Sequence, residues 1–313
     1  MKKEILVSVY CLAYNHEKYI RQTLEGFVNQ KTNFKYEVFV HDDASTDNTS
    51  GIIKEYARKF PDIIIPILQK ENQYSKGISI SKTIIFPKMH GKYVAVCEGD
   101  DYWIDNEKLQ IQVDFLEKNP NYVACVHNSN IYNCITNKTK KMYKVKQDYD
   151  IDFYDVIEEG SGSYQTSSLL YRKEAMEKRP TFFEDIAPIG DWPTAINLSL
   201  KGKIRFINKT MSVYRIFSTG SWTYNNNSNI TQHNKKVINF LNSVNKYTKY
   251  KYEEKIRQTI LRHNYVMNEA LGNYIELQNE KYKHIWADKP LLFKIKRYIK
   301  RQKIYCLINN RKD

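Results

Sequence analysis

Two adjacent carboxylates, Asp100 and Asp101, directly follow an apolar segment that is typical of a buried strand, residues 92–97. Holding two like charges at the end of such a strand costs free energy unless a cation or hydrogen-bond donors compensate them. A hard divalent ion that bridges carboxylate and diphosphate oxygens would compensate them. The alternative is a solvated acidic turn, so the pair alone leaves the chemistry open.

Polar residues at two further strand ends favour the first interpretation. Tyr14 and Asn15 follow the apolar segment 5–11, and Asp43 comes just after the segment 36–41. In sheets of parallel strands, ligands bind beyond the carboxyl ends of the strands. Three polar strand ends at one edge therefore predict a nucleotide-binding crevice.

The elements that must position these residues alternate between strand-like and helix-like patterns. Strands are predicted at 5–11, 36–41, 63–68, 93–97, 122–132 and 204–216, and helices at 17–30, 47–60, 78–89, 106–118 and 191–200. Repeated β-α units with apolar strands predict an α/β fold, a Rossmann-like and mostly parallel sheet flanked by helices. A Ser/Thr/Asn/Gly-rich break at 218–229 divides the chain into a domain at 1–222 and a basic, helical C-terminal region at 223–313.

The order of the motifs resembles the inverting, nucleotide-sugar-dependent glycosyltransferases of family 2, which have the GT-A fold. The matching positions are 7–15, 41–47, 91–103, Asp105, Lys108, Leu109, Gln112, 190–192 and 213–215. Each motif alone is weakly specific, but their order and spacing extend the resemblance over residues 5–222. The residues after 222 lie outside it.

The resemblance implies a role for each residue on the donor side. Ala13, Tyr14 and Asp43 would bind the donor nucleotide, with Asp43 facing the base, which is usually uracil. Asp100 would lie nearer the ribose, and Asp101 would be the direct ligand of Mg²⁺ or Mn²⁺. Such a metal neutralises the charge that develops on the leaving diphosphate.

Asp191 corresponds to the catalytic base of the family. A carboxylate on the opposite face of the sugar takes the proton from the attacking acceptor hydroxyl. One base without an enzyme nucleophile means a single displacement with inversion. Asp191 also precedes a predicted helix, so a plain N-cap is its alternative role.

Four further residues are candidates for contacts with phosphate or acceptor. Lys76 and Lys82 would reach the donor phosphates, and Trp103 and Trp192 would stack on sugar. The alternatives are solvated lysines and tryptophans that belong to the core.

One position departs from the family pattern. Many relatives carry a histidine that completes the metal site two residues after the position of Arg215, and Phe217 stands there in this chain. The metal would then rest on Asp101, the diphosphate and water. We therefore expect it to be held weakly or to be dispensable.

The basic charge of the chain belongs to its C-terminal third. Residues 1–200 contain 25 Lys and Arg against 28 Asp and Glu, whereas residues 201–313 contain 24 against 7. Residues 288–308 have an apolar helical face surrounded by basic residues, a pattern that suits an anionic membrane surface. The alternative is a basic helix that packs on its own protein. No nucleic-acid-binding motif accompanies the charge, so nucleic acid is not the expected partner.

The cysteines and the apolar segments predict the compartment. The five cysteines are scattered without metal-ligand spacing, which favours reduced thiols and a cytoplasmic protein. No apolar stretch reaches the ~18 residues that span a bilayer. We expect a cytoplasmic protein that associates peripherally with the inner face of the cell membrane.

These features predict an inverting glycosyltransferase of polysaccharide biosynthesis, which moves a sugar from a nucleoside diphosphate, UDP being expected, to a glycan or lipid-linked acceptor. A sugar nucleotidylyltransferase is an alternative, but it would need a Gly-rich basic loop after the first strand, and residues 11–15 do not form one. A non-catalytic protein that binds nucleotide sugars or membranes is the other alternative. The identity of the sugar, the acceptor, the linkage and the oligomeric state have no readable pattern.

Overall fold

The computed structural model describes residues 4–177, 179–185, 191–218, 230–283 and 285. Contacts divide the chain into two compact units, one formed by residues 1–180 with 189–226 and the other by 181–188 with 227–313. The predicted boundary at 222 and 223 and the predicted basic helix at 288–308 lie outside the described residues. Both remain predictions.

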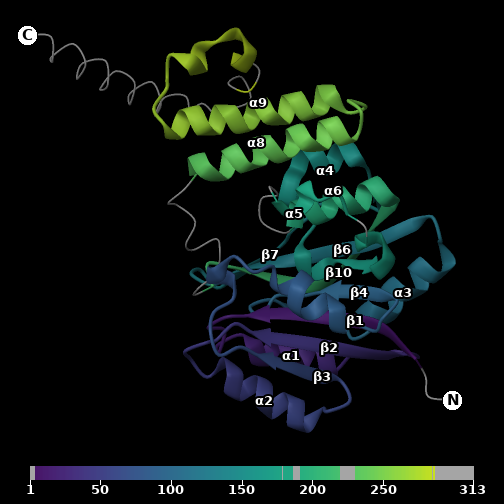
Figure 1. The fold of residues 1–313 in the computed structure, drawn as a ribbon. Helices are drawn as coiled ribbons and strands as arrows, with labels where there is room; N and C mark the ends of the chain where they lie inside the picture. The colour runs from purple at the N-terminus through teal and green to yellow at the C-terminus, as the bar shows by residue number, and fades with distance from the viewer. Residues whose placement is uncertain (1–3, 178, 186–190, 219–229, 284, 286–313) are drawn as a thin grey trace, which may run out of the picture. The chain divides into compact units, whose positions relative to one another are not determined.

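The first unit is built on one ten-stranded sheet (Figure 1). Its strands are β1 Ile5–Ala13, β2 Lys35–Asp42, β3 Ile64–Leu68, β4 Tyr93–Val96, β5 Tyr102–Trp103, β6 Tyr122–Asn133, β7 Lys138–Lys141, β8 Tyr149–Ile151, β9 Leu170–Arg172 and β10 Lys203–Ile216. The order across the sheet is β3-β2-β1-β4-β9-β6-β10-β5, with β7 beside β6 and β8 beside β10.

The pairs β1–β2, β1–β4, β2–β3 and β6–β10 are parallel. Every antiparallel pair involves one of the short strands β5, β7, β8 and β9. β1, β2 and β4 are rich in β-branched and aromatic side chains that are buried between the helical layers. The predicted α/β sheet flanked by helices is thus confirmed.

Helices cover this sheet through their apolar faces. Among the described residues of the first unit, the α-helices are α1 Ile20–Val28, α2 Thr49–Lys59, α3 Lys108–Lys118, α4 Phe153–Glu159 and α6 Asp191–Lys201. In α1, Ile20, Leu24 and Phe27 recur at helical spacing and are fully buried in the main core cluster. The core therefore lies between the parallel strands and the helices, and it fixes where the strands end.

The helix predicted over 78–89 is not an α-helix. Ser81–Ile85 forms a π-helical turn, and Phe86–Lys88 forms a 3₁₀ turn. Pro87 has no N–H to donate to the preceding turn, so an α-helical hydrogen-bond pattern cannot continue through it.

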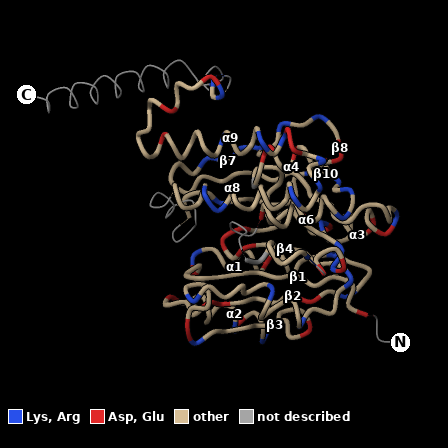
Figure 2. The backbone as a smooth tube through the Cα atoms, turned by 45° about the horizontal axis from the view of Figure 1, so that its top comes forward, with Lys and Arg blue, Asp and Glu red and all other residues tan. Residues whose placement is uncertain are grey.

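The second unit is helical. It contains α5 Phe182–Asp185, α8 Ile230–Tyr247 and α9 Glu253–Ala270, with α8 and α9 side by side (Figure 1). The Phe182 and Phe183 rings lie 5.9 and 5.2 Å from the Phe240 ring, which holds α5 against α8. Within 230–283 and 285, ten Lys and Arg stand against five Asp and Glu, and Figure 2 shows these charges spread along the helices and their connections.

Candidate active site

Three strand ends meet at one edge of the sheet. β1 lies between β2 and β4 and is parallel to both, so the carboxyl ends of these strands are neighbours. The Asp43 N–H donates to the Ala13 carbonyl at 3.0 Å, and the Gly99 N–H donates to the Leu12 carbonyl at 2.9 Å. The polar segments that follow the three strands therefore lie together, as the sequence indicated.

Asp43 organises the loop after β3. Its two carboxylate oxygens accept hydrogen bonds from the backbone N–H groups of Gln73 at 2.7 Å and Tyr74 at 3.0 Å. Tyr14 and Tyr74 are exposed at this edge, at 42% and 65%. Exposed aromatic rings beside backbone groups suit a flat nucleotide base. Contact of Asp43, Ala13 or Tyr14 with a base remains a prediction.

The loops after β1 and β2 are joined in a strained conformation. Asn15 and Ala44 both have positive φ, 55° and 61°, a region that costs an L-residue such as alanine about 1–2 kcal/mol. The Asn15 N–H donates to Ser45 Oγ at 2.8 Å, and Asn15 Oδ1 accepts from the Thr46 N–H at 2.8 Å. Such strain persists only where surrounding contacts enforce it, and it is common at functional sites.

Asp101 is fully buried and held by protein donors. Its Oδ1 accepts from the Arg215 N–H at 2.9 Å, and its Oδ2 accepts from Gln165 Nε2 at 2.7 Å. Burial, followed by the charges of Asp100 and Glu98, raises the pKa of Asp101 well above its usual range. Asp101 therefore ties three segments of the fold together.

Asp100 is also buried, and its surroundings differ. Ser218 Oγ donates to Asp100 Oδ2 at 2.7 Å, and the Arg215 guanidinium donates to the Asp100 carbonyl. Arg215 itself lies over the Tyr102 ring, with its guanidinium carbon 4.3 Å from the ring centroid. Arg215, near the end of β10, thus fixes the Asp100 backbone. Among the described residues, Asp100 Oδ1 has no hydrogen-bond partner, whereas Asp100 Oδ2 is bonded to Ser218.

Glu98 is a site residue that the sequence analysis missed. Its side chain is reached by water yet surrounded by protein atoms, and this partial burial, with the charges of Asp191 and Asp100, raises its pKa to about 8. Glu98 begins a turn in which the Asp101 N–H donates to the Glu98 carbonyl at 3.1 Å. A strand pattern therefore could not reveal it, and the available signal was a third acidic residue within four positions of the sequence.

Asp191 is the first residue of α6 and lies near the acidic edge, the name used here for Glu98 and Asp100 at the end of β4. Burial raises its pKa, while a hydrogen bond from the Thr166 side chain opposes the rise. Burial raises the pKa of Tyr10 and of Tyr214, and the negative charge of Asp191 adds to both rises. The structure therefore brings Asp191 close to Glu98, although the two residues are far apart in the sequence.

The structure places both candidate tryptophans in the core. Trp103 and Trp192 are 4% and 5% exposed. The Trp103 Nε1–H donates to the Ser167 carbonyl at 2.9 Å, and the Trp192 Nε1–H donates to the Val156 carbonyl at 2.7 Å. Buried rings with satisfied N–H groups match the core interpretation rather than stacking on sugar.

The two candidate lysines lie on exposed segments. Lys76 forms an ion pair with Glu71 and leaves about half of its side chain accessible, at 49%. Lys82 is exposed on the π-helical turn. Their predicted contacts with phosphate remain predictions.

The acidic edge fits a hard cation only together with a ligand. Among the described residues, no three His, Cys, Asp or Glu side chains are placed to hold a metal ion by themselves. Glu98 and Asp100 nevertheless lie near each other: burial raises the pKa of Glu98 most, and the charges of Asp191 and Asp100 add to the rise. Phe217, 40% exposed with φ of 60°, supplies no metal ligand. Diphosphate oxygens would have to complete such a site.

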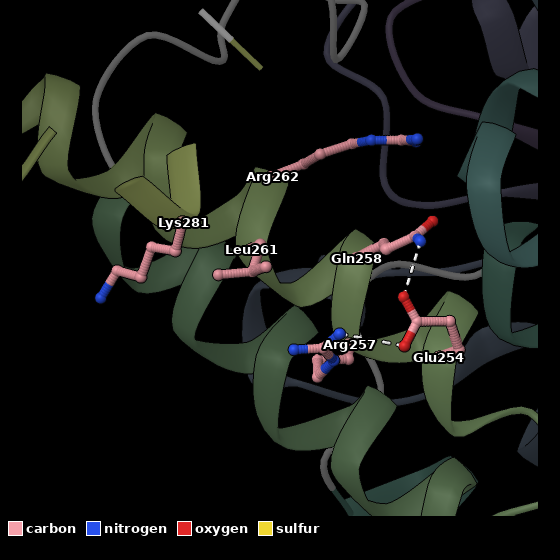
Figure 3. A pocket seen from close by; sticks show the side chains of 6 residues that line it. All are labelled: Glu254, Arg257, Gln258, Leu261, Arg262 and Lys281. Carbon is pink, nitrogen blue, oxygen red and sulfur yellow. Dashed lines mark hydrogen bonds and ion pairs between the residues drawn. The ribbon is translucent and has the colours of Figure 1, made fainter. Parts of the chain in front are cut away.

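A separate surface pocket of about 340 Å³ lies in the second unit (Figure 3). Its lining residues are Glu254, Arg257, Gln258, Leu261, Arg262 and Lys281. Arg257 and Gln258 both bond to Glu254, at 3.0 and 2.8 Å, and Lys281 pairs with Glu276 at 2.7 Å. These pairs stabilise the surface of α9 and offer no catalytic arrangement.

None of the helices in the described part of the chain is both long and apolar enough to cross a membrane.

The mostly parallel sheet and the helices that flank it form a GT-A fold. The sequence matches "Glycosyl transferase family 2" over residues 8–179, more than half of the chain. The chain belongs to this family.

Relatives in sequence support this assignment. An uncharacterized protein of Mycobacterium tuberculosis is 33% identical over 69% of this chain and 60% of its own length. The chondroitin synthase of Escherichia coli is 27% identical over 67% of this chain and 29% of its own length. The Escherichia coli enzyme WfaP, a UDP-Glc:α-D-GlcNAc-diphosphoundecaprenol β-1,3-glucosyltransferase, is 34% identical over 36% of this chain and 41% of its own. The chain thus spans about 60% or less of these relatives.

Solved structures share the fold. TarS of S. aureus, residues 1–349 in complex with UDP-GlcNAc, superposes with a TM-score of 0.58 at 14% identity over 93% of this chain and 78% of its own. The mannosyltransferase PcManGT of Pyrobaculum calidifontis, in complex with GDP-Man and Mn²⁺, gives 0.57 at 15% identity over 98% and 81%. At these identities the likeness concerns the fold.

Proposed function

We propose that the protein transfers a sugar from a nucleoside diphosphate, UDP being expected, to a glycan or lipid-linked acceptor with inversion at the anomeric carbon. The observation that carries this proposal is the approach of Asp191 to the acidic edge formed by Glu98 and Asp100. Two groups of carboxylates with different neighbours suit the two sides of a displacement reaction. Family membership supports the reaction class, and the nucleotide sugars bound to the structural neighbours support the donor class.

On the donor side, Asp43, Ala13 and Tyr14 hold the nucleotide and Asp100 lies toward the ribose and diphosphate. The sequence analysis assigned the metal to Asp101. Since both Asp101 oxygens already accept hydrogen bonds from the protein, Asp100 and Glu98 are better placed to face a cation. A bound Mg²⁺ or Mn²⁺ would supply neutralisation of the leaving diphosphate. Asp101 would then hold the acidic edge in place.

On the acceptor side, Asp191 acts as the general base. A raised pKa makes its carboxylate a better proton acceptor, and the Thr166 hydrogen bond keeps it ionised and oriented. Asp191 accepts the proton of the acceptor hydroxyl while the acceptor oxygen attacks the sugar. The bond to the diphosphate breaks in the same step, which inverts the anomeric carbon.

The acceptor is proposed from the relatives and the charge. The relatives include enzymes named for chondroitin synthesis and for a diphosphoundecaprenol-linked acceptor. The basic C-terminal third would bring the protein to an anionic membrane surface, where lipid-linked acceptors reside. These observations support the proposal that the protein works peripherally at the inner face of the cell membrane.

Asp191→Asn tests the base. It removes the proton acceptor while keeping the shape, so we expect kcat for transfer to fall by about 10²–10⁴ with donor affinity unchanged. Release of UDP from UDP-glucose and UDP-N-acetylglucosamine in the presence of p-nitrophenyl glycosides measures transfer, and calorimetry measures donor binding. Asp114→Asn, an exposed acid on α3 that accepts from Gln110, is the matched control and should transfer normally.

Transfer by Asp191→Asn at the wild-type rate would exclude Asp191 as the base. A thermal-shift screen of UDP and GDP sugars, with and without Mn²⁺, tests the donor site separately. If none of these nucleotide sugars raises the Tm, the result would count against the whole proposal.

A further inference from the structure

The hydroxyl of Tyr164 is buried without a hydrogen-bond partner in the described part of the structure. The side chain is 4% exposed, and no described group reaches its Oη. Two other tyrosines of the same unit, one buried and one half-buried, have partners for their hydroxyls. Tyr36 donates to the Phe27 carbonyl at 2.9 Å, and Tyr143 donates to the Gly162 carbonyl at 3.0 Å. An unpaired buried hydroxyl weakens the fold, so its presence calls for an explanation.

The residues after Tyr164 are fixed to both sides of the site. Gln165 Nε2 donates to Asp101 at 2.7 Å, and Gln165 Oε1 accepts from the Ser167 N–H at 2.7 Å. The Thr166 side chain bonds to Asp191. One short segment therefore spans the distance between the acidic strand end and the proposed base. Tyr164 stands at the start of that segment, so its backbone position is set by the same contacts.

Tyr164 lies close enough to Asp191 to be affected by its charge. Burial raises the pKa of Tyr164 well above its usual range, and the charges of Asp191 and of the Tyr10 phenol add to that rise. Burial also raises the pKa of Tyr10, with added contributions from Asp191 and Glu98. Tyr164 therefore remains protonated, close to Asp191, and capable of both donating and accepting a hydrogen bond.

We propose that the Tyr164 hydroxyl binds a hydroxyl group of the sugar held next to Asp191 and thereby contributes to the choice of sugar. The inference rests on the proposed function, because it requires a carbohydrate between Asp191 and the acidic edge. A sugar hydroxyl would satisfy the buried phenol, and a sugar lacking that hydroxyl would leave it unpaired. Sites built in this way reject the analogue without the hydroxyl strongly.

Tyr164→Phe separates this role from a structural one. Removing an unpaired hydroxyl takes away no protein hydrogen bond, so we expect an unchanged or higher Tm. The loss of a substrate hydrogen bond should lower kcat/KM by roughly 10- to 100-fold. Tyr36→Phe is the matched control, because its hydroxyl has a protein partner. It should lower the Tm and leave kcat/KM unchanged.

The sugar could belong to the donor or to the acceptor, and two measurements distinguish them. Calorimetry with UDP alone and with UDP-N-acetylglucosamine or UDP-glucose measures the affinity for the donor. Release of UDP in water without an acceptor measures how well the enzyme activates the bound donor. Transfer to p-nitrophenyl glycosides reports the acceptor. For a donor hydroxyl, Tyr164→Phe loses affinity for the intact nucleotide sugar and not for UDP. For an acceptor hydroxyl, donor binding is unchanged and the KM for the glycoside rises.

The inference would be overturned if Tyr164→Phe left both the donor affinity and the kcat/KM for transfer to the glycosides unchanged. It would also be overturned if Tyr164→Phe lowered the Tm as much as Tyr36→Phe does. These results leave the proposed function standing, because the wild type is then active. A wild type that turns over no nucleotide sugar would instead overturn the proposed function and this inference with it.

Discussion

A single buried lysine illustrates how the residues behind the site affect stability. Lys108, on α3, is fully buried; its Nζ donates to Gln112 Oε1 at 2.6 Å and lies 4.1 Å from the centroid of the Trp103 ring. Gln112 Nε2 donates to the Ser168 carbonyl at 2.8 Å, which supports the segment between the acidic edge and Asp191. Burial lowers the pKa of Lys108 to about 7.

This pKa predicts how stability depends on pH. The lysine has an ordinary pKa of about 10.5 when the chain is unfolded, so between pH 7 and 10.5 the unfolded state binds the extra proton. Stability therefore rises with pH in this window, by at most about 1.4 kcal/mol per pH unit. Lys108→Met should remove this contribution. Urea denaturation of both proteins at pH 7, 8 and 9 measures it, and parallel pH profiles would contradict the assigned pKa.

Part of the site could be predicted from the sequence. The other site residues could not, because they come from segments that are far apart along the chain. Asp100, Asp101 and Asp191 were predicted, and the structure groups them near one edge. Glu98 was missed because it lies in the turn that ends at Asp101, where no strand spacing applies. Gln165 and Thr166 carry no sequence signal, because their role arises only when β9 pairs with β4 and brings their segment to the acidic strand end.

Among the elements, β4 is positioned by a glycine. A Cβ atom on Gly91 would lie 2.4 Å from the Ser8 backbone nitrogen and 2.6 Å from the Val7 carbonyl carbon. β1 and β4 can approach closely only because Gly91 has no side chain. This contact helps to set where Glu98 leaves the sheet.

Gly91→Ala should therefore destabilise the protein, by about 1–3 kcal/mol, and should also weaken donor binding because β4 is displaced. Gly162→Ala is the control, since the nearest atom to its new Cβ, Glu159 Oε2, is 4.0 Å away. Urea denaturation and calorimetry with UDP provide the two measurements. Equal stability of the two variants would show that β1 and β4 adjust at little cost.

The predictability of an element followed its apolar pattern. β1, β2 and β4 were predicted because their residues form continuous apolar runs that are bounded by turn residues. β7, at Lys138–Lys141, consists of exposed residues and exists because β6 offers it an edge. α4 was missed although Asp152 and Asp155 form a capping box at its start. Its position inside an irregular region hid that signal.

At the scale of the whole molecule, the charge is divided unevenly between the two units. We expect the full-length protein to sediment with vesicles containing phosphatidylglycerol at low salt, because the basic residues after 286 favour an anionic surface. A variant ending at residue 286 should bind much less. Neutral phosphatidylcholine vesicles are the control, and added salt should weaken binding. Equal sedimentation of both proteins would contradict a membrane role for the C-terminal residues.

The position of β9 between β4 and β6 has a consequence for how such enzymes diversify. Because β9 bonds to both strands, the segment before it stays beside the acidic edge whatever the chain does just after β6. None of residues 134–148 is buried, although β7 pairs with β6 and the Tyr143 ring packs on Phe206. The exposed residues between these contacts can therefore vary in length and composition while the core is retained. A chimera that exchanges them between family members would alter this surface and leave the residues at the end of β4 in place.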